Sequence, residues 1–550
     1  MSYPLSLHSL VIEDDERAKE AYHGIFDSIA QDCPNLPFAP APPSFAFSYK
    51  EALALLDSSR IFHVVILDLR LPENPRMPAN EGVELGMSLL ARCVERDRFP
   101  IPALLVISAH IGSTEQTRMQ DTLRQGFHYG RAFVKENYSL LETEIRQACN
   151  EAFRYCSIGV HIRDAGMEQY PSITPRDEDL LRRSAFQQSG AIGLDLTWWS
   201  AKSIGKINAG SSSTANPWTK VLMGRYLLKD GRGASRPKFF KLMDGADAGF
   251  VIESARQVEQ KLSHIKLSSY INAKSTALVV TEKVGANDAR PESLDSVFTK
   301  CNSHEVCQVA SQIANQVEQL GDLLPESKPL SVLLWPAHDK NLLAAQWSRF
   351  GYQMQPRVSP DVDPIALYSE LVASTERLRI HERSLVHGDL HISNVALDLE
   401  PNGPHAYIFD AGVVKRNVAG RDIAVLEVST ILHQRIDASG FVQICTVLYG
   451  AATRETDDPG APSPNTFAGN IVEFIQALRR VAAAWNDLDV YALMVFDFAL
   501  IQVGGLAFGS SGNKIVDPQS AAHFLAAVAG WYQRIRETGR GDVTTPEVPS

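Results

Sequence analysis

The chain has 550 residues, of which 45% are hydrophobic and 21% are charged, and its formal net charge is −11. This length exceeds what one hydrophobic core usually supports, so we expect two or three globular domains. The acidic balance argues against a nucleic-acid partner, because binding to a phosphate backbone needs clustered Lys and Arg.

Residues 1–156 alternate apolar runs with helical patterns. Strands are predicted at 7–12, 63–69, 103–109 and 131–135, and a closing helix at 139–156. Strands that alternate with helices predict a doubly wound, parallel five-stranded sheet that is covered on both faces. The proline-rich segments 33–43 and 71–80 are predicted to be loops.

Polar side chains stand where these strands end: Glu13, Asp14, Asp15, Asp68, Ser108 and Lys135. The carboxyl ends of parallel strands meet at one edge of a sheet, and ligands gather there. Carboxylates from neighbouring strand ends suit Mg²⁺, which prefers oxygen ligands. Such an ion would neutralise a phosphoryl group carried by Asp68.

These residues resemble the response-regulator receiver family over residues 5–155. The resemblance implies that Asp68 is the phospho-acceptor, that Glu13 and Asp14 bind Mg²⁺ with it, and that Asp15 faces solvent. It also implies that Ser108 and Lys135 form the switch that follows the phosphoryl group.

Two positions depart from the family pattern. Glu136 stands where the family usually has a proline after the lysine. The position of the switch aromatic is Ala132, and Phe133 lies one residue away. Phosphorylation is therefore expected to have an output that differs from the usual rotamer switch.

A linker is predicted at 157–175, followed by a helix that begins at Pro175. The segment 206–218 is predicted to be a loop, and strands are predicted at 219–228, 238–243 and 276–284. A helix is predicted at 250–265 between the last two of these strands.

After residue 291 the pattern is mostly helical, and the tail 537–550 is predicted to be disordered. The longest apolar stretch, 491–508, carries Asp497 and Gln502, which favours a buried helix over a membrane span. No signal peptide is predicted, and the seven scattered cysteines without a CxxC pair favour reduced thiols. We expect a cytoplasmic protein with no membrane partner.

The strongest signal is the segment HGDLHISN at 387–394, which is followed sixteen residues later by Asp410 at the end of an apolar strand. Phosphoryl transfer needs a carboxylate that orients the attacking hydroxyl and takes its proton, and it needs oxygen ligands for Mg²⁺. Asp389 would supply the first function, and Asn394 with Asp410 the second. His387 and His391 are interpreted as packing residues of the loop.

This pattern resembles the aminoglycoside-phosphotransferase branch of the protein-kinase-like fold, from about residue 176 to 536. The resemblance implies a two-lobed α+β domain, with an N-lobe at 176–290, a C-lobe at 291–536, and ATP and Mg²⁺ as cofactors. Asp422 matches the carboxylate that braces the catalytic loop, a structural role.

Nucleotide-binding residues are predicted in the smaller lobe. Lys241 is preferred to Lys238 as the lysine that contacts the phosphates, and Glu253 is preferred to Glu259 as its helical partner. Gly210 and Ser211 lie in a loop that could cover the phosphates, although a single glycine makes this motif weak. The backbone of Glu282 and its neighbours would meet the adenine.

The sequence thus favours a response regulator whose output domain is an ATP-dependent phosphotransferase acting on a hydroxyl of a small molecule or protein. An upstream histidine kinase or phosphotransfer protein would phosphorylate Asp68, and a receiver-mediated homodimer is left open. The alternative is a nucleotide-binding signalling scaffold that has lost turnover, because Phe409-Asp410-Ala411-Gly412 departs from the commoner patterns.

Overall fold

The computed structural model contains the whole chain and describes it outside residues 1–4, 32–37, 75–83, 96–100, 109–118, 120–121, 124–126, 135–137, 164–171, 204–217, 230–234, 263–264, 274–275, 284–290, 326–327, 332–340, 342, 346, 348–361, 375–376, 401, 411–414, 435, 451–459, 509–517 and 539–550. The chain divides into two compact units. The first unit contains Met1–Ala201, Thr219–Ala248 and Ser268–Thr281, and the second contains Lys202–Trp218, Gly249–Leu267 and Glu282–Ser550.

The first unit begins with a five-stranded sheet in the order β4-β2-β5-β6-β7. All of its neighbouring strands run parallel, as the alternation of strands and helices predicts. The strands are β2 (Ser9–Ile12), β4 (Ser44–Ala46), β5 (Val64–Asp68), β6 (Ala103–Ser108) and β7 (Gly130–Val134). The order, with the second strand along the chain at one edge, is that of the flavodoxin-like doubly wound folds.

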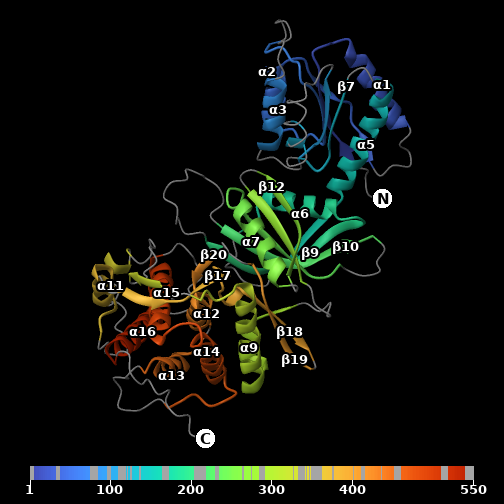
Figure 1. The fold of residues 1–550 in the computed structure, drawn as a ribbon. Helices are drawn as coiled ribbons and strands as arrows, with labels where there is room; N and C mark the ends of the chain where they lie inside the picture. Colours follow the sequence, from blue (N-terminus) through green and yellow to red (C-terminus); the bar gives the residue numbers. More distant parts are fainter. Residues whose placement is uncertain are drawn as a thin grey trace. The chain divides into compact units, whose positions relative to one another are not determined.

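Helices cover both faces of this sheet (Figure 1). They are α1 (Ala18–Gln31), α2 (Tyr49–Asp57), α3 (Glu84–Glu95) and α5 (Tyr138–Cys156). Alternate strand residues point to opposite faces, so Val65 and Leu67 pack with α2 and α3, whereas Val64 and Ile66 pack with α1 and α5. Burial on both faces explains why the strands read as continuous apolar runs.

Four of the five strands, and the closing helix, were predicted from the sequence. The short strand β4 was not, because three residues are too few to show an alternating pattern. The segment 33–43 was predicted to be a loop, but β3 (Phe38–Pro40) lies within it and pairs with β1 (Leu5–Leu7). That part of the loop prediction was wrong, since backbone pairing at a sheet edge tolerates a terminal proline.

A second sheet of six strands, in the order β12-β13-β11-β10-β9-β8, follows α5. Its strands are β8 (Gly159–Arg163), β9 (Ala191–Ser203), β10 (Trp218–Leu228), β11 (Lys238–Asp244), β12 (Ile265–Ala273) and β13 (Thr276–Lys283). Helix α6 (Pro175–Gln187) begins with a capping box between Thr174 and Asp177 and packs Leu180 and Leu181 into the core of this sheet. Strand β8 lies inside the segment 157–175, which was predicted to be a linker, and β9 and β12 were not predicted.

A buried polar contact joins the two parts of the first unit. The Tyr155 hydroxyl, at the end of α5, donates to the Asp179 carboxylate on α6, and the backbone N–H of Ile101 donates to the same carboxylate at 3.4 Å. His128 stacks on Tyr155 with ring centroids 3.8 Å apart. Burial raises the pKa of both Asp179 and Tyr155 and lowers that of His128. The N-terminal sheet is therefore tied to α6 through the amino-terminal ends of β6 and β7.

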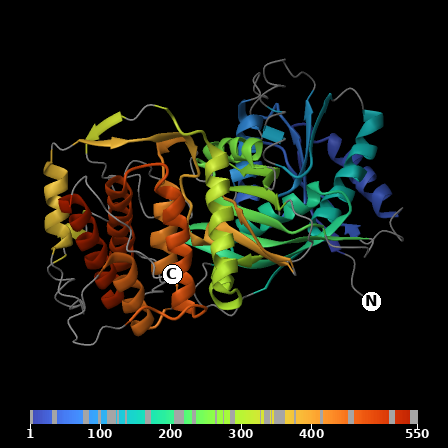
Figure 2. The same cartoon turned by 60° about the horizontal axis from the view of Figure 1, so that its bottom comes forward.

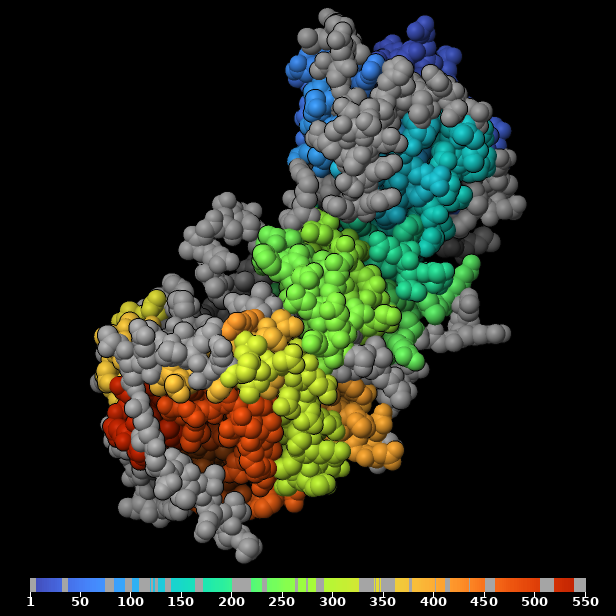
Figure 3. All heavy atoms as spheres, in the orientation of Figure 1, coloured from blue at the N-terminus to red at the C-terminus, as the bar shows by residue number. Residues whose placement is uncertain are grey.

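The second unit is mostly helical, as predicted. Its helices are α7 (Ala248–Lys261), α8 (Asp295–Lys300), α9 (Ser303–Leu320), α11 (Pro364–Ala373), α12 (Arg421–Leu432), α13 (Ala438–Tyr449), α14 (Phe467–Ala482), α15 (Leu488–Phe508) and α16 (Pro518–Thr538). The helices α12 to α16 lie side by side in Figure 2, and α9 packs along α14, as the surface in Figure 3 shows.

Short strands connect these helices and flank the segment HGDLHISN at 387–394. They are β14 (Glu292–Ser293), β15 (Lys328–Ser331), β16 (Arg377–Ile380), β17 (Glu382–Val386), β18 (Val395–Glu400), β19 (Gly403–Ile408) and β20 (Lys415–Val418). β17 pairs with β20, and β18 pairs with β19, in both cases antiparallel. The segment 387–394 therefore leaves one strand pair and enters the other.

The core of the second unit encloses a charged cluster around Glu427, whose side chain is fully buried. Glu427 on α12 accepts hydrogen bonds from Arg479 at 2.6 and 3.0 Å and from the hydroxyls of Tyr449 and Tyr491 at 2.7 Å each. Four donors compensate for the removal of this carboxylate from water. Helix α15 is also buried, and Asp497 is 0% exposed within it. Across the described residues, no helix has the length and apolar character needed to cross a membrane.

We predict that His63 makes the N-terminal sheet less stable at acidic pH. Its Nδ1 accepts the backbone N–H of His8 at 3.0 Å, and burial, followed by the nearby His8, lowers the pKa of His63 to about 4 from 6.5. The unfolded chain takes up this proton below about pH 6.5 while the folded chain resists it. The contribution to stability is thus complete above pH 6.5 and is lost progressively between pH 6.5 and 4.

The variant His63→Asn keeps an acceptor close to the Nδ1 position but does not titrate. The loss of unfolding free energy between pH 7 and pH 4.5, measured by urea denaturation, should be smaller in the variant than in the wild type. Equal losses would contradict the prediction.

Candidate active site and acidic sheet edge

The acidic edge of the N-terminal sheet forms as predicted. Glu13 directly follows β2, Asp68 ends β5, and these two strands are neighbours. Carboxylate oxygens of Glu13, Asp14 and Asp68 lie within 4.8 Å of one another, and Glu13 and Asp68 are only 2% and 5% exposed. Three carboxylates this close repel one another, and a hard divalent cation with oxygen ligands would offset that repulsion. The donor set therefore fits Mg²⁺.

Asp15 is directed elsewhere, as expected for the solvent-facing member of the acidic run. Its Oδ1 accepts the backbone N–H and the Nε–H of Arg17 at 3.0 and 3.1 Å. Both side chains are largely exposed, so this ion pair contributes little to stability. Asp15 is consequently a matched control for the other carboxylates of this edge.

The other predicted receiver residues are only partly described. Ser108 is the last residue of β6, next to the end of β5, whereas Lys135 and Glu136 lie outside the described residues. On β7, Ala132 packs with the α2 and α3 side of the sheet, and Phe133 packs with the α1 and α5 side. Phe133 therefore does not take the place of an aromatic side chain at position 132, because neighbouring strand residues face opposite ways.

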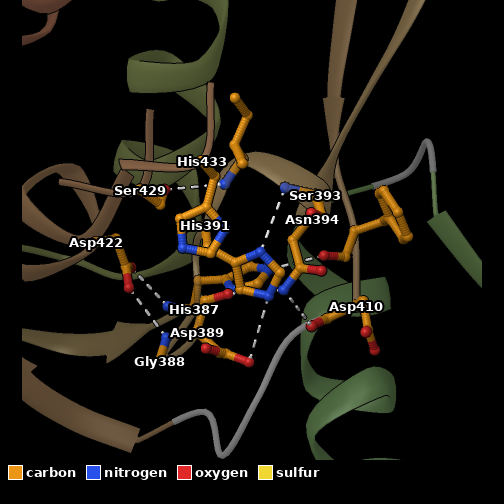
Figure 4. Close-up of polar contacts among 12 residues, drawn as sticks. His387, Gly388, Asp389, His391, Ser393, Asn394, Asp410, Asp422, Ser429 and His433 are labelled. Carbon is orange, nitrogen blue, oxygen red and sulfur yellow. Dashed lines mark hydrogen bonds and ion pairs between the residues drawn. The ribbon is translucent and has the colours of Figure 1, made fainter. Parts of the chain in front are cut away.

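The loop that joins β17 to β18 is held by the carboxylate of Asp422. This residue lies in the first turn of α12 and is 1% exposed. Its two oxygens accept the backbone N–H groups of His387 at 2.7 Å and of Gly388 at 3.0 Å (Figure 4). Gly388 has a φ of +81°, a conformation that favours glycine. Asp422 thus braces the loop, which is the structural role predicted for it.

Asn394 connects the loop to Asp410. Its amide nitrogen lies 2.7 Å from the carbonyl oxygen of Asp389 and 3.4 Å from that of Asp410. Both neighbours are acceptors, so the NH₂ group must face them, and the amide oxygen Oδ1 is directed away. An amide oxygen in that position can serve as a ligand for Mg²⁺. Asn394 and the backbone of Asp410 are therefore neighbours, and their joint binding of Mg²⁺ stays a prediction.

Asp410 has an uncommon backbone conformation. Its φ is +58°, one of two positive values at non-glycine residues among those described. The conformation costs about 1 kcal/mol for an ordinary residue, although Asp tolerates it better than most. Residues held in such conformations cluster at functional sites, because the surrounding structure must enforce them. Here the enforcing contacts are Phe409 N–H to Asn394 O at 2.9 Å and the Asn394 amide.

The two histidines of the loop differ in environment. His387 is fully buried, and its Nε2 lies 3.0 Å from the carbonyl oxygen of Phe409, so it carries the proton on Nε2 and ties the loop to the strand before Asp410. His391 is 17% exposed, and its Nε2 lies 3.8 Å from Oδ2 of Asp389. The sequence suggested packing for both residues, and the proximity of His391 to Asp389 was not predicted.

The predicted nucleotide residues are distributed over both units. On β11, Phe240 and Leu242 face α6, so Lys241 lies on the opposite face, whereas Lys238 faces the α6 side and donates to Ser268 Oγ at 2.9 Å. On α7, Glu253 is exposed and accepts from Gln257 at 3.3 Å, and Glu259 is half-buried. Glu282 lies near the end of β13, and Gly210 and Ser211 lie outside the described residues.

Comparison with known proteins gives weak matches. No protein-family model matches the chain, and no curated protein is similar to it. An aminoglycoside-3'-phosphotransferase of type VIII is 18% identical, with 64% of this chain and 98% of that one covered, at a TM-score of 0.25. A protein of Ralstonia eutropha JMP134, provisionally assigned as an aminoglycoside phosphotransferase, is 12% identical, with 60% and 95% covered, at a TM-score of 0.29. TM-scores this low do not establish a shared fold.

We predict that Asp422→Asn weakens the loop. One of the two backbone N–H groups would face an NH₂ donor in place of an acceptor, which should lower the unfolding free energy by about 2–3 kcal/mol. Asp437 provides a control, because it caps α13 by accepting the N–H of Gly440 at 2.7 Å, and Asn caps helices as well as Asp. Urea denaturation should show the loss for Asp422→Asn and almost none for Asp437→Asn. A similar effect of both substitutions would contradict the bracing role.

Proposed function

We propose that the second unit carries the catalytic loop of an ATP-dependent phosphotransferase that acts on a hydroxyl group. One observation carries the proposal: the Asn394 amide links the backbone of Asp389 to that of Asp410, while Asp422 holds the start of the same loop. A carboxylate and an amide oxygen on one braced loop, with a second carboxylate on the adjoining segment after β19, are the groups that phosphoryl transfer requires.

The predicted site residues have distinct roles in this proposal. Asp389, whose side chain is 38% exposed, accepts the proton of the attacking hydroxyl. Asn394 and Asp410 would hold Mg²⁺, which supplies positive charge next to the nucleotide phosphates. Lys241 would contact the phosphates, Glu253 would orient that lysine, and the backbone near Glu282 would meet the adenine.

In the proposed reaction, the terminal phosphoryl group of ATP is transferred to the acceptor hydroxyl. The acceptor O–H bond breaks and its proton passes to the Asp389 carboxylate, while the acceptor oxygen bonds to the terminal phosphorus. The bond from that phosphorus to the bridging oxygen breaks, and the nucleoside diphosphate leaves with the electron pair. The acceptor is a hydroxyl of a small molecule or a protein.

We predict that Asp389→Asn abolishes turnover and leaves nucleotide binding intact. Release of inorganic phosphate from Mg·ATP, with water as the acceptor, should fall about 10²–10⁴-fold, because the amide cannot accept the proton. Binding of a fluorescent ATP analogue should be little changed. Asp410→Asn, in contrast, should raise the Mg²⁺ concentration needed for that binding.

The outcomes also separate the proposal from its alternative. Nucleotide binding without turnover in the wild type, unaffected by Asp389→Asn, would indicate a nucleotide-binding signalling scaffold. The change from the commoner metal-binding patterns to Phe409-Asp410-Ala411-Gly412 is the feature that favours this alternative. A wild-type protein that neither binds nor turns over the nucleotide would exclude both the phosphotransferase and the nucleotide-binding scaffold.

We further propose that the N-terminal sheet is a receiver domain whose phospho-acceptor is Asp68. The parallel strand order and the cluster of Glu13, Asp14 and Asp68 support this proposal. A histidine kinase or phosphotransfer protein would then be the upstream partner, and Ser108 and Lys135 would respond to the phosphoryl group. Regulation of the second unit requires that the two receiver states interact with it differently.

We predict that acetyl phosphate and Mg²⁺ label the wild type with one acid-labile phosphoryl group. Asp68→Asn should remove the label, and Asp14→Asn should weaken labelling through loss of a metal ligand. Asp15→Asn should label normally, because Asp15 bonds Arg17 instead. Intact-mass spectrometry measures each variant. A label that persists in Asp68→Asn, or that requires Asp15, would contradict the assignment.

A further inference from the structure

The side chains of Asp389 and His391 share one side of the loop. Leu390, between them, is 0% exposed and packs in the core of the second unit, and His391 is extended with φ −111° and ψ 170°. The Nε2 atom of His391 lies 3.8 Å from Oδ2 of Asp389, so the two side chains lie on the same side of a γ-turn at Leu390. The His391 backbone N–H also donates to the Asp389 carbonyl at 3.0 Å, which fixes their separation.

The His391 ring has a defined tautomer. Its Nδ1 accepts the backbone N–H of Ser393 at 3.3 Å and caps the short helix η2 (Ile392–Asn394). A nitrogen that accepts a hydrogen bond carries no proton, so a neutral ring carries its proton on Nε2. That Nε2 is the atom 3.8 Å from Oδ2 of Asp389. In a neutral ring the proton is therefore on the nitrogen that lies near the carboxylate (Figure 4).

We propose that His391 is a positioning residue for Asp389, an inference that rests on the proposed function. Its Nε2–H holds Oδ2, so the other carboxylate oxygen, Oδ1, faces the acceptor hydroxyl and takes its proton. The distance of 3.8 Å is longer than a hydrogen bond. Catalytic contacts are often long in a protein without substrate and shorten in the reacting complex.

Two substitutions separate positioning from simple capping. In His391→Asn, the side-chain oxygen can still accept the Ser393 N–H, since Asn is a strong capping residue, but the side chain is too short to reach Asp389. In His391→Gln, an amide N–H reaches about as far as Nε2 does, and the capping acceptor at the Nδ1 position is lost. His391→Asn therefore keeps the helix cap, and His391→Gln keeps an N–H donor that can extend to Asp389.

We expect His391→Asn to lower kcat for Mg·ATP turnover about 10–100-fold with KM nearly unchanged, because a misplaced base affects the chemical step. His391→Gln should recover most of kcat. A residue that only caps η2 would give the opposite ranking, with Asn close to the wild type and Gln impaired, and that result would overturn the inference. Thermal unfolding of both variants measures any loss of stability separately.

The same experiment distinguishes the failure of this inference from the failure of the proposed function. Turnover that is absent from the wild type, or is insensitive to Asp389→Asn, would refute both. Turnover that requires Asp389 but is the same in His391→Asn would refute the positioning role alone. Imidazole ¹H–¹⁵N spectra, with the His391 signals identified by their loss in His391→Gln, should show the Nε2–H form, and an Nδ1–H form would also overturn the inference.

Discussion

The geometry of the loop at 387–394 depends on the Asp422 carboxylate, which accepts the backbone N–H groups of His387 and Gly388. These two amides have no strand partner, since the chain leaves β17 at this point, and buried N–H groups without acceptors are costly. The bonds set the direction in which the chain leaves the strand. The positions of Asp389, His391 and Asn394 follow from that direction, because each lies within seven residues of His387.

Helix α12 can hold the loop in place because the helix itself is fixed. Nearly all of its residues are buried, and Glu427 accepts four hydrogen bonds from α13, α14 and α15. Ser429, on the same helix, accepts the backbone N–H of Ile392 at 3.0 Å. One helix thus bonds both the start and the end of the loop, and a buried ion pair prevents it from shifting. A polar core can in this way contribute to precision at a site more than to stability.

The sequence predicted the parts of the structure that have strong local patterns. Apolar runs such as 64–68 and 103–108 and the long helices were found, whereas β4, with three residues, and β8, within a presumed linker, were not. The spacing of the strand and the following loop and helix favoured Lys241 over Lys238, and the structure places the two lysines on opposite faces. The proximity of His391 to Asp389 could not be predicted, because it depends on tertiary structure. The backbone N–H of Ser393 donates to the His391 ring, and Leu390 is buried in the core.

The first unit constrains how a change at Asp68 could reach its second sheet. Asp68 and Ser108 lie at the carboxyl ends of their strands, whereas Ile101 and His128, which contact Asp179 and Tyr155, precede the amino ends of β6 and β7. The six residues of β6 span about 20 Å between these edges. No side chain covers that distance, so an effect of the proposed phosphorylation of Asp68 would have to travel along the sheet or along α5, whose last turn carries Tyr155. Such transmission needs an element with two conformations, whose equilibrium depends on the state of both sites. Among the described residues, α5 is the one continuous element that packs on the N-terminal sheet and also contacts Asp179.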